Sequence, residues 1–76
     1  MSKIQLTIKL IKEESVLDVI FDEKLSFKQN LDLLKDIKEI ETVNKYFYDP
    51  FRHLFLKDDI PIKHFNLKSN MYLEVY

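Results

Sequence analysis

Several absences narrow the class of protein that this sequence encodes. Its 76 residues contain no cysteine, which excludes disulfides, thiol catalysis and thiolate metal ligands. No uninterrupted apolar run exceeds three residues, so the sequence predicts neither a transmembrane helix nor a signal-peptide core, and we expect a cytoplasmic protein. The formal net charge is only −1, so the sequence lacks the long-range attraction to phosphate that supports nucleic-acid binding. Neither nucleic acid nor direct membrane insertion is expected.

The composition is that of an ordinary globular protein. Hydrophobic residues make up 46% and charged residues 33% of the chain, a balance that is unlike disordered or membrane proteins. A chain of this length buries roughly 60% of its unfolded surface and has no room for a second core. We therefore expect residues 1–76 to form a single domain.

The first third of the sequence alternates apolar and polar residues with the two-residue period of a strand. Ile4, Leu6, Ile8 and Leu10 alternate with polar residues, a solvated stretch interrupts them at 12–15, and the pattern resumes from Leu17 to Phe21. These two runs predict a β-hairpin. Its turn lacks Asn-Gly and Asp-Gly, which favours a loop longer than two residues.

A helix is predicted next. Ser26 and Gln29 have the spacing of a capping box, in which each side chain bonds the backbone N–H of the other residue, so the helix should begin at Phe27. The period indicates an end near Glu41. The apolar stripe that should face the sheet consists of Phe27, Leu31, Leu34 and Ile37.

The rest of the chain is rich in aromatic residues and has shorter patterns. Eight of its ten Phe and Tyr residues follow Val43. Residues 49–50 read as a turn, 53–57 as a strand with Leu54 and Leu56 inward and Phe55 outward, and 60–62 as an extended edge. Residues 71–76 read as the final strand.

This order of elements predicts an α+β fold. The segments Leu54-Phe55-Leu56 and Phe65-Asn66-Leu67, followed by the closing strand, resemble the last third of ubiquitin. The resemblance implies a ubiquitin-like β-grasp fold: a four- or five-stranded mixed sheet packed on one helix, with its first and last strands adjacent and parallel. The residues expected to face the helix are Ile4, Leu6, Ile8, Leu17, Val19, Phe21, Leu54, Leu56, Leu67, Leu73 and Val75.

A narrower resemblance comes from residues 15–21 and the helix after them. They are similar to the second strand and the helix of the YukD/EsaB family, whose members are small free-standing bacterial ubiquitin-like proteins encoded with type VII secretion systems. The resemblance implies a protein partner in the cytoplasmic part of that secretion machinery.

The absence of glycine bears on how such a protein would act. Ubiquitin-like proteins that serve as covalent tags or sulfur carriers need a diglycine tail, because only glycine lets bare backbone thread into the channel of an activating enzyme. The sequence contains no glycine, and its closing strand runs to Tyr76. We expect a non-conjugated protein that acts by being bound.

Candidate catalytic and metal-binding residues are few. His53 and His64 lie on separate predicted elements, with ten residues between them and no cysteine near either, which favours surface histidines over a metal site. Adjacent acids at 13–14 and 58–59 fall in predicted turns, where carboxylates are solvated and lack the enclosed site that acid–base catalysis needs. We expect no enzyme activity, no metal and no cofactor.

The surplus of aromatic residues has two interpretations. Tyr46, Phe47, Tyr48 and Phe51 could form a satellite cluster beneath the loop after the helix. By strand parity, however, the side chains of Ile20, Phe55, Tyr72 and Tyr76 point away from the helix, onto a sheet face that no predicted element covers. We predict that these four residues bind a partner protein, with a polar rim of Lys9, Asp18 and Glu74.

Two functions follow from these expectations. The favoured one is an accessory or adaptor protein that docks through its sheet face, as a cytoplasmic component of a type VII secretion system. The alternative is a phage-borne or immunity-type binding module with the same fold. Weak self-association is a further expectation.

Overall fold

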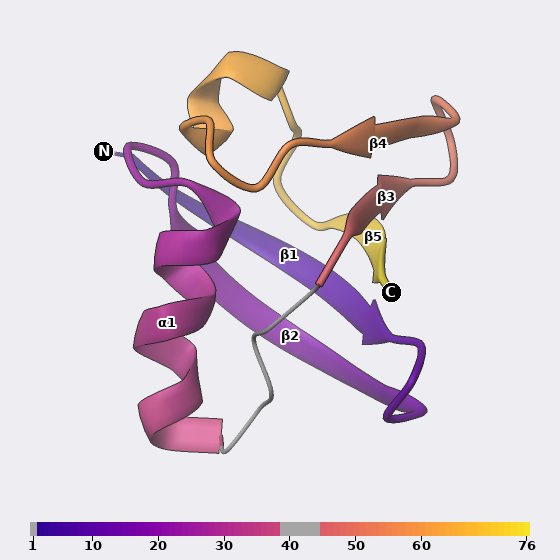
Figure 1. Cartoon of the computed structure of the whole chain (residues 1–76). Coiled ribbons are helices and arrows are strands. Elements are labelled where there is room, and N and C mark those ends of the chain that lie inside the picture. The colour runs from indigo at the N-terminus through magenta and orange to yellow at the C-terminus, as the bar shows by residue number, and fades with distance from the viewer. Residues whose placement is uncertain (1, 39–44) are drawn as a thin grey trace.

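The computed structural model describes residues 2–38 and 45–76, with the side chains of 2–34 and 45–76. The elements are β1 (Lys3–Leu10), β2 (Ser15–Asp22), α1 (Phe27–Lys38), β3 (Phe47–Asp49), β4 (Leu54–Leu56), the 3-10 helix η1 (Ile62–Phe65) and β5 (Met71–Val75). One sheet curves around α1, and η1 lies on the connection from β4 to β5 (Figure 1). Within the described ranges, no helix is long and apolar enough to span a membrane.

The sheet is mixed and has five strands in the order β2-β1-β5-β3-β4. β1 pairs with β2 in antiparallel orientation and with β5 in parallel orientation, so the first and last strands lie at its centre. β3 is antiparallel to both β5 and β4. The predicted mixed sheet with adjacent, parallel first and last strands is confirmed.

The core lies between the sheet and α1 and follows from the alternation of the strands. Because successive side chains of a strand point to opposite faces, β1 and β2 place their apolar residues against the helix. Phe27 at the start of α1 stacks on Phe47 of β3, with ring centroids 4.2 Å apart and an interplanar angle of 18°. The buried apolar residues are Ile4, Leu6, Ile8, Leu10, Val19, Phe21, Phe27, Leu31, Phe47, Leu56, Ile62, Leu67, Leu73 and Val75.

The predicted start of the helix is confirmed. The Gln29 N–H donates to Ser26 Oγ at 3.1 Å, and the Ser26 N–H donates to Gln29 Oε1 at 2.9 Å. This reciprocal pair satisfies two backbone donors at the N-terminus of α1. The predicted end near Glu41 and the side chain of Ile37 lie outside the described residues.

Three predictions for the second half of the chain are corrected. Leu54 was expected in the core, but it is 50% exposed, because it is the first residue of a three-residue edge strand and follows the turn directly. Ile62 was expected in an extended edge, but it begins η1 and is fully buried. Phe47 was assigned by one interpretation to a satellite cluster under a loop, but it lies in β3 and in the main core.

Turns in this glycine-free chain use other residues in the left-handed region. The φ angles are 54° at Glu14, 55° at His53, 53° at Asn66 and 67° at Asn70. Asparagine adopts this conformation more readily than most residues. The turn from β1 to β2 spans residues 11–14, which confirms the expected longer loop.

Candidate protein-binding surface

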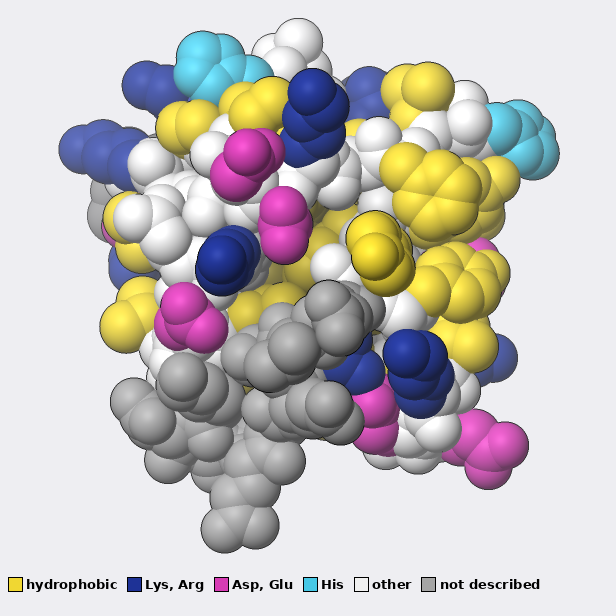
Figure 2. All heavy atoms as spheres, viewed as in Figure 1, with side chains coloured by type: hydrophobic (Ala, Val, Ile, Leu, Met, Phe, Trp, Pro, Cys, Tyr) yellow, Lys and Arg dark blue, Asp and Glu magenta, His cyan; other side chains and the backbone are white. Residues whose placement is uncertain are grey.

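Four aromatic side chains gather on the sheet face opposite α1. They are Tyr46, Tyr48, Phe55 and Tyr76, and we call them the aromatic patch. They come from β3, from β4 and from residues flanking β3 and β5. Together they line an open hollow of about 740 Å³. Hydrophobic side chains cluster over this half of the molecule, on the right in Figure 2.

Strand pairing brings the aromatic patch together. Tyr48 lies opposite Phe55 in the β3–β4 register, and their ring centroids are 4.8 Å apart. The backbone N–H groups and carbonyls of Tyr46 and Tyr76 exchange two hydrogen bonds, of 2.8 and 2.9 Å. The ring of Tyr76 meets that of Tyr48 edge-on, with centroids 6.3 Å apart. Cross-strand aromatic neighbours stabilise a sheet, and here they also form one continuous apolar surface.

The patch is exposed despite its size. Tyr46 is 61% exposed, Phe55 68% and Tyr76 38%, and Tyr48 is half-buried between its neighbours. Contiguous exposed aromatic groups of this kind are typical of binding surfaces rather than of an ordinary monomer surface.

A carboxylate fixes the tyrosine hydroxyls beside the patch. Tyr76 Oη donates to Glu74 Oε1 at 3.0 Å, and Tyr72 Oη donates to Glu74 Oε2 at 3.3 Å. The hydrogen bond to Glu74 raises the pKa of Tyr76, and burial together with the Glu74 charge raises that of Tyr72. Both hydroxyls therefore stay protonated and remain donors at neutral pH.

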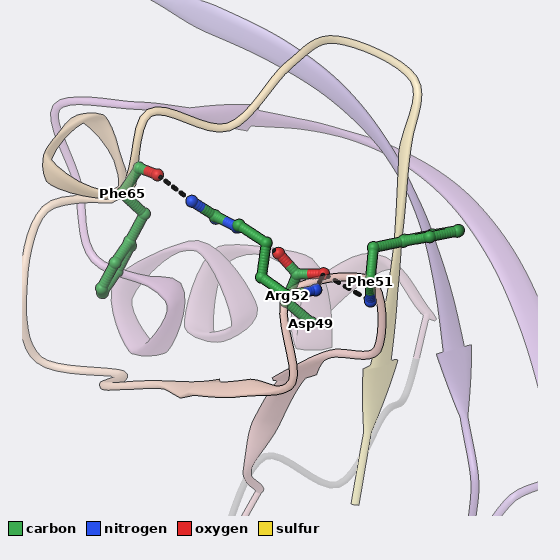
Figure 3. A network of polar contacts seen from close by, with 4 residues as sticks. All are labelled: Asp49, Phe51, Arg52 and Phe65. Carbon is green, nitrogen blue, oxygen red and sulfur yellow. Dashed lines mark hydrogen bonds and ion pairs between the residues drawn. The ribbon is translucent and has the colours of Figure 1, made fainter.

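A buried carboxylate, Asp49, holds the turn that joins β3 to β4 (Figure 3). Asp49 Oδ1 accepts hydrogen bonds from the backbone N–H groups of Phe51 at 2.9 Å and Arg52 at 3.2 Å. Asp49 Oδ2 accepts from Arg52 Nε at 2.6 Å, and Arg52 Nη1 donates to the carbonyl of Phe65 at 3.2 Å. Burial alone would raise the pKa of Asp49, but the bonds from Arg52 and Phe51 outweigh it and hold that pKa below its ordinary value of 3.8. The ionised carboxylate thus positions Tyr48 and Phe55.

A second ion pair anchors the start of β3. The Lys45 side chain is almost fully buried, and its Nζ pairs with Glu13 Oε1 in the turn between β1 and β2. Because Tyr46 directly follows Lys45, this ion pair links the first residue of the aromatic patch to the turn of the β1–β2 hairpin.

The predicted partner-binding residues are only partly brought together. Phe55 and Tyr76 belong to the aromatic patch. Tyr72 is half-buried next to them and lines a separate hollow with Phe51 and Met71. Ile20 is 69% exposed but lies on edge strand β2, opposite Gln5, so that β1, β5 and β3 separate it from Phe55.

Sequence reasoning missed Tyr46 and Tyr48 as members of the site. A signal for them was present, because Tyr46, Phe47 and Tyr48 alternate outward, inward and outward immediately before a predicted turn. Three residues are too short a run to predict a strand from its period alone.

The predicted polar rim also lies on this face. Lys9 is opposite Glu74 in the β1–β5 register, and Thr7 Oγ1 donates to Asp18 Oδ1 at 2.8 Å. His53 Nδ1 lies 3.2 Å from Tyr48 Oη. Among the described residues, no three His, Cys, Asp or Glu side chains are grouped so that they could hold a metal ion.

Comparison with solved structures identifies the fold. A designed protein based on ubiquitin matches with a TM-score of 0.76 and 13% identity over 99% of this chain and 88% of its own. The ubiquitin-like domain of an Arabidopsis thaliana protein matches with a TM-score of 0.76 and 14% identity over 100% of this chain and 78% of its own. The chain therefore adopts a ubiquitin-like β-grasp fold.

The comparisons do not go beyond the fold. No family model and no curated protein matches the sequence. The fold match extends to 239 chains of solved structures, and a fold used so widely does not define a function.

Proposed function

We propose that this protein is a ubiquitin-like protein-binding module that docks on a partner protein through the aromatic patch. The observation that supports this function is the exposure of Tyr46 and Phe55, at 61% and 68%, on a sheet face that no described element covers. A large aromatic side chain gains most when a partner removes it from water, and Tyr is enriched among the residues that dominate binding energies. The proposal retains Tyr72 at the border of the patch.

We also propose that the protein acts without being covalently attached to another protein. The support is that these 76 residues contain no glycine, whereas a covalent tag or sulfur carrier needs a diglycine segment that can enter an activating enzyme. Mass spectrometry of the protein from its native host should detect the free species. An isopeptide-linked or thiocarboxylate form would contradict this part of the proposal.

We further propose a cytoplasmic partner in a type VII secretion system. The support is the resemblance of residues 15–21 and the helix after them to the YukD/EsaB family. Neighbouring genes for WXG-type substrates and an FtsK-like ATPase are the expected finding. If these genes are absent, the alternative of a phage-borne or immunity-type binding module is preferred.

Two matched variants test the binding surface. Phe55→Ala should weaken binding to the purified partner by about 2 kcal/mol, the range of a binding hot spot. Val16→Ala is the control, because Val16 is 60% exposed on β2, far from the patch, and it should bind as the wild type does. Binding by calorimetry and thermal melting should be measured for both. Lowered melting of Phe55→Ala with unchanged affinity would overturn the proposal.

A further inference from the structure

The two edge strands of the sheet, β2 and β4, are protected unequally against pairing with another strand. On β2, the Asn30 side chain forms hydrogen bonds with both backbone groups of Asp22. Asn30 Oδ1 accepts from the Asp22 N–H at 2.8 Å, and Asn30 Nδ2 donates to the Asp22 carbonyl at 3.0 Å. β2 also carries the carboxylates of Asp18 and Asp22. Charges and covered backbone groups are devices that prevent edge-to-edge association.

β4 has neither device. Its three residues, Leu54, Phe55 and Leu56, are all apolar. Leu54 is 50% exposed and Phe55 68%. In Figure 1 no further strand lies beyond β4. The strand is an uncharged edge with exposed apolar side chains, which favours pairing, while its length of three residues limits how far pairing can extend.

The backbone of Phe55 points to the open side of β4. Hydrogen-bonded pairs alternate along an antiparallel ladder, and Tyr46 exchanges its two bonds with β5. The backbone N–H groups and carbonyls of Phe47 and Asp49 therefore point toward β4, where these residues lie opposite Leu56 and Leu54. By the same alternation, the N–H and the carbonyl of Phe55 face away from β3, where the described residues supply no partner.

We infer that β4 pairs with β4 of a second copy of this chain, antiparallel about a two-fold axis at Phe55. The strand reads Leu-Phe-Leu in both directions, so a two-fold axis places Phe55 opposite its own copy and Leu54 opposite Leu56 of the second copy. The outward N–H and carbonyl of Phe55 then exchange two hydrogen bonds with the same groups of the second copy. A closed two-fold contact of this kind is the commonest arrangement of oligomers.

The association is weak. His53 has a φ of 55° and leaves the extended conformation, so the pairing is limited to the three residues of β4. So short a contact buries less than the roughly 1,200 Å² typical of stable complexes. The dimer therefore forms only at high protein concentration. This inference does not depend on the proposed function, because it uses the strand edge rather than the face of the sheet.

The first test follows single amide protons of the wild-type protein by NMR. As the concentration rises to about 1 mM, where binding worth about 4 kcal/mol becomes visible, hydrogen exchange of the Phe55 N–H should slow. The N–H of Val16 on edge strand β2 is the control in the same spectra and should not change. Exchange at Phe55 that is independent of concentration would overturn the inference.

The second test uses sedimentation velocity on two charge variants. Leu54→Lys places a charge in the pairing strand and should raise the dissociation constant of the dimer at least about tenfold. Val16→Lys adds the same charge at an exposed position of β2 and should associate as the wild type does. Unchanged self-association of Leu54→Lys would contradict pairing through β4. If Leu54→Lys does not fold, the amide exchange of the wild type decides.

A third variant separates this inference from the proposed function. Tyr46→Ala removes part of the aromatic patch without touching β4. It should weaken binding of the partner protein and leave self-association unchanged. Loss of self-association in Tyr46→Ala would place the contact on the face of the sheet and overturn pairing through β4.

Discussion

The two halves of the sheet are stabilised in different ways. β1 and β2 have eight residues each and pair along their whole length, so that alternating aliphatic side chains determine their register. β3 and β4 have three residues each and depend on stacked aromatic rings, a buried carboxylate and the Lys45–Glu13 pair. The comparison shows that short strands need specific side-chain interactions, and these interactions also position the exposed aromatic patch.

The largest difference between the halves is expected for truncation of their inward residues. Phe47→Ala removes a fully buried ring that stacks on Phe27 and should lower the free energy of unfolding by about 3 to 5 kcal/mol. Leu17→Ala in β2 should cost less, because Leu17 is only half-buried at the border of the core. Urea unfolding measures both. An equal loss for both variants would show that the β3–β4 half does not depend on its aromatic core.

The next effect concerns two carboxylates, one from each half. Asp49→Ala removes the acceptor of three hydrogen bonds from a buried position and should lower the free energy of unfolding by about 2 to 3 kcal/mol. Asp18→Ala in β2 removes an exposed carboxylate bonded to Thr7 and should change it by less than about 0.5 kcal/mol. A small loss for Asp49→Ala would mean that the turn is held by the backbone alone.

Acid should reduce the difference between Asp49→Ala and the wild type. The pKa of Asp49 is lower in the folded protein than its ordinary value of 3.8. The carboxylate therefore contributes its full stability above that value, and the contribution is lost as the pH falls through the folded pKa. Urea unfolding of both proteins at about pH 6 and about pH 2.5 measures this loss. A difference that stays constant over this range would contradict the role of the ionised carboxylate.

A smaller effect is expected at the helix cap, which lies between the two halves. Ser26→Ala removes the acceptor of the Gln29 N–H and should lower the free energy of unfolding by about 1 kcal/mol. Ser26→Asp keeps an acceptor at this position and serves as the control. If both variants lose equal stability, burial of the serine rather than capping is responsible.

The smallest effects on stability are expected for the outward residues of each half. Ile20→Ala changes a side chain that is 69% exposed and should alter the free energy of unfolding by less than about 0.5 kcal/mol. Phe55→Ala changes a side chain that is 68% exposed but pairs with Tyr48, and it should cost at most about 1 kcal/mol. Their effects on binding differ, because only Phe55 lies in the aromatic patch. Equal loss of partner affinity in Ile20→Ala would extend the interface to β2, as the sequence predicted.

The aliphatic half and the helix start could be predicted because their signals are local. The alternation from Ile4 to Leu10 and the capping pair of Ser26 and Gln29 lie within short stretches of sequence, and the structure confirms both. The resemblance to ubiquitin also predicted the parallel pairing of the first and last strands, which the structure confirms. For the candidate site, strand parity was sufficient to place Phe55 and Tyr76 on the outer face.

The aromatic half was decided by tertiary structure. Whether three residues form a strand depends on partners far away in sequence: Phe47 is inward because β3 pairs with β5 and its ring meets Phe27. Leu54 has the parity of a core residue but is exposed, because β4 became an edge strand. The sequence by itself determined which faces of the long strands are apolar. Only long-range pairing determined which short segments became strands, and therefore which aromatic side chains meet on the surface.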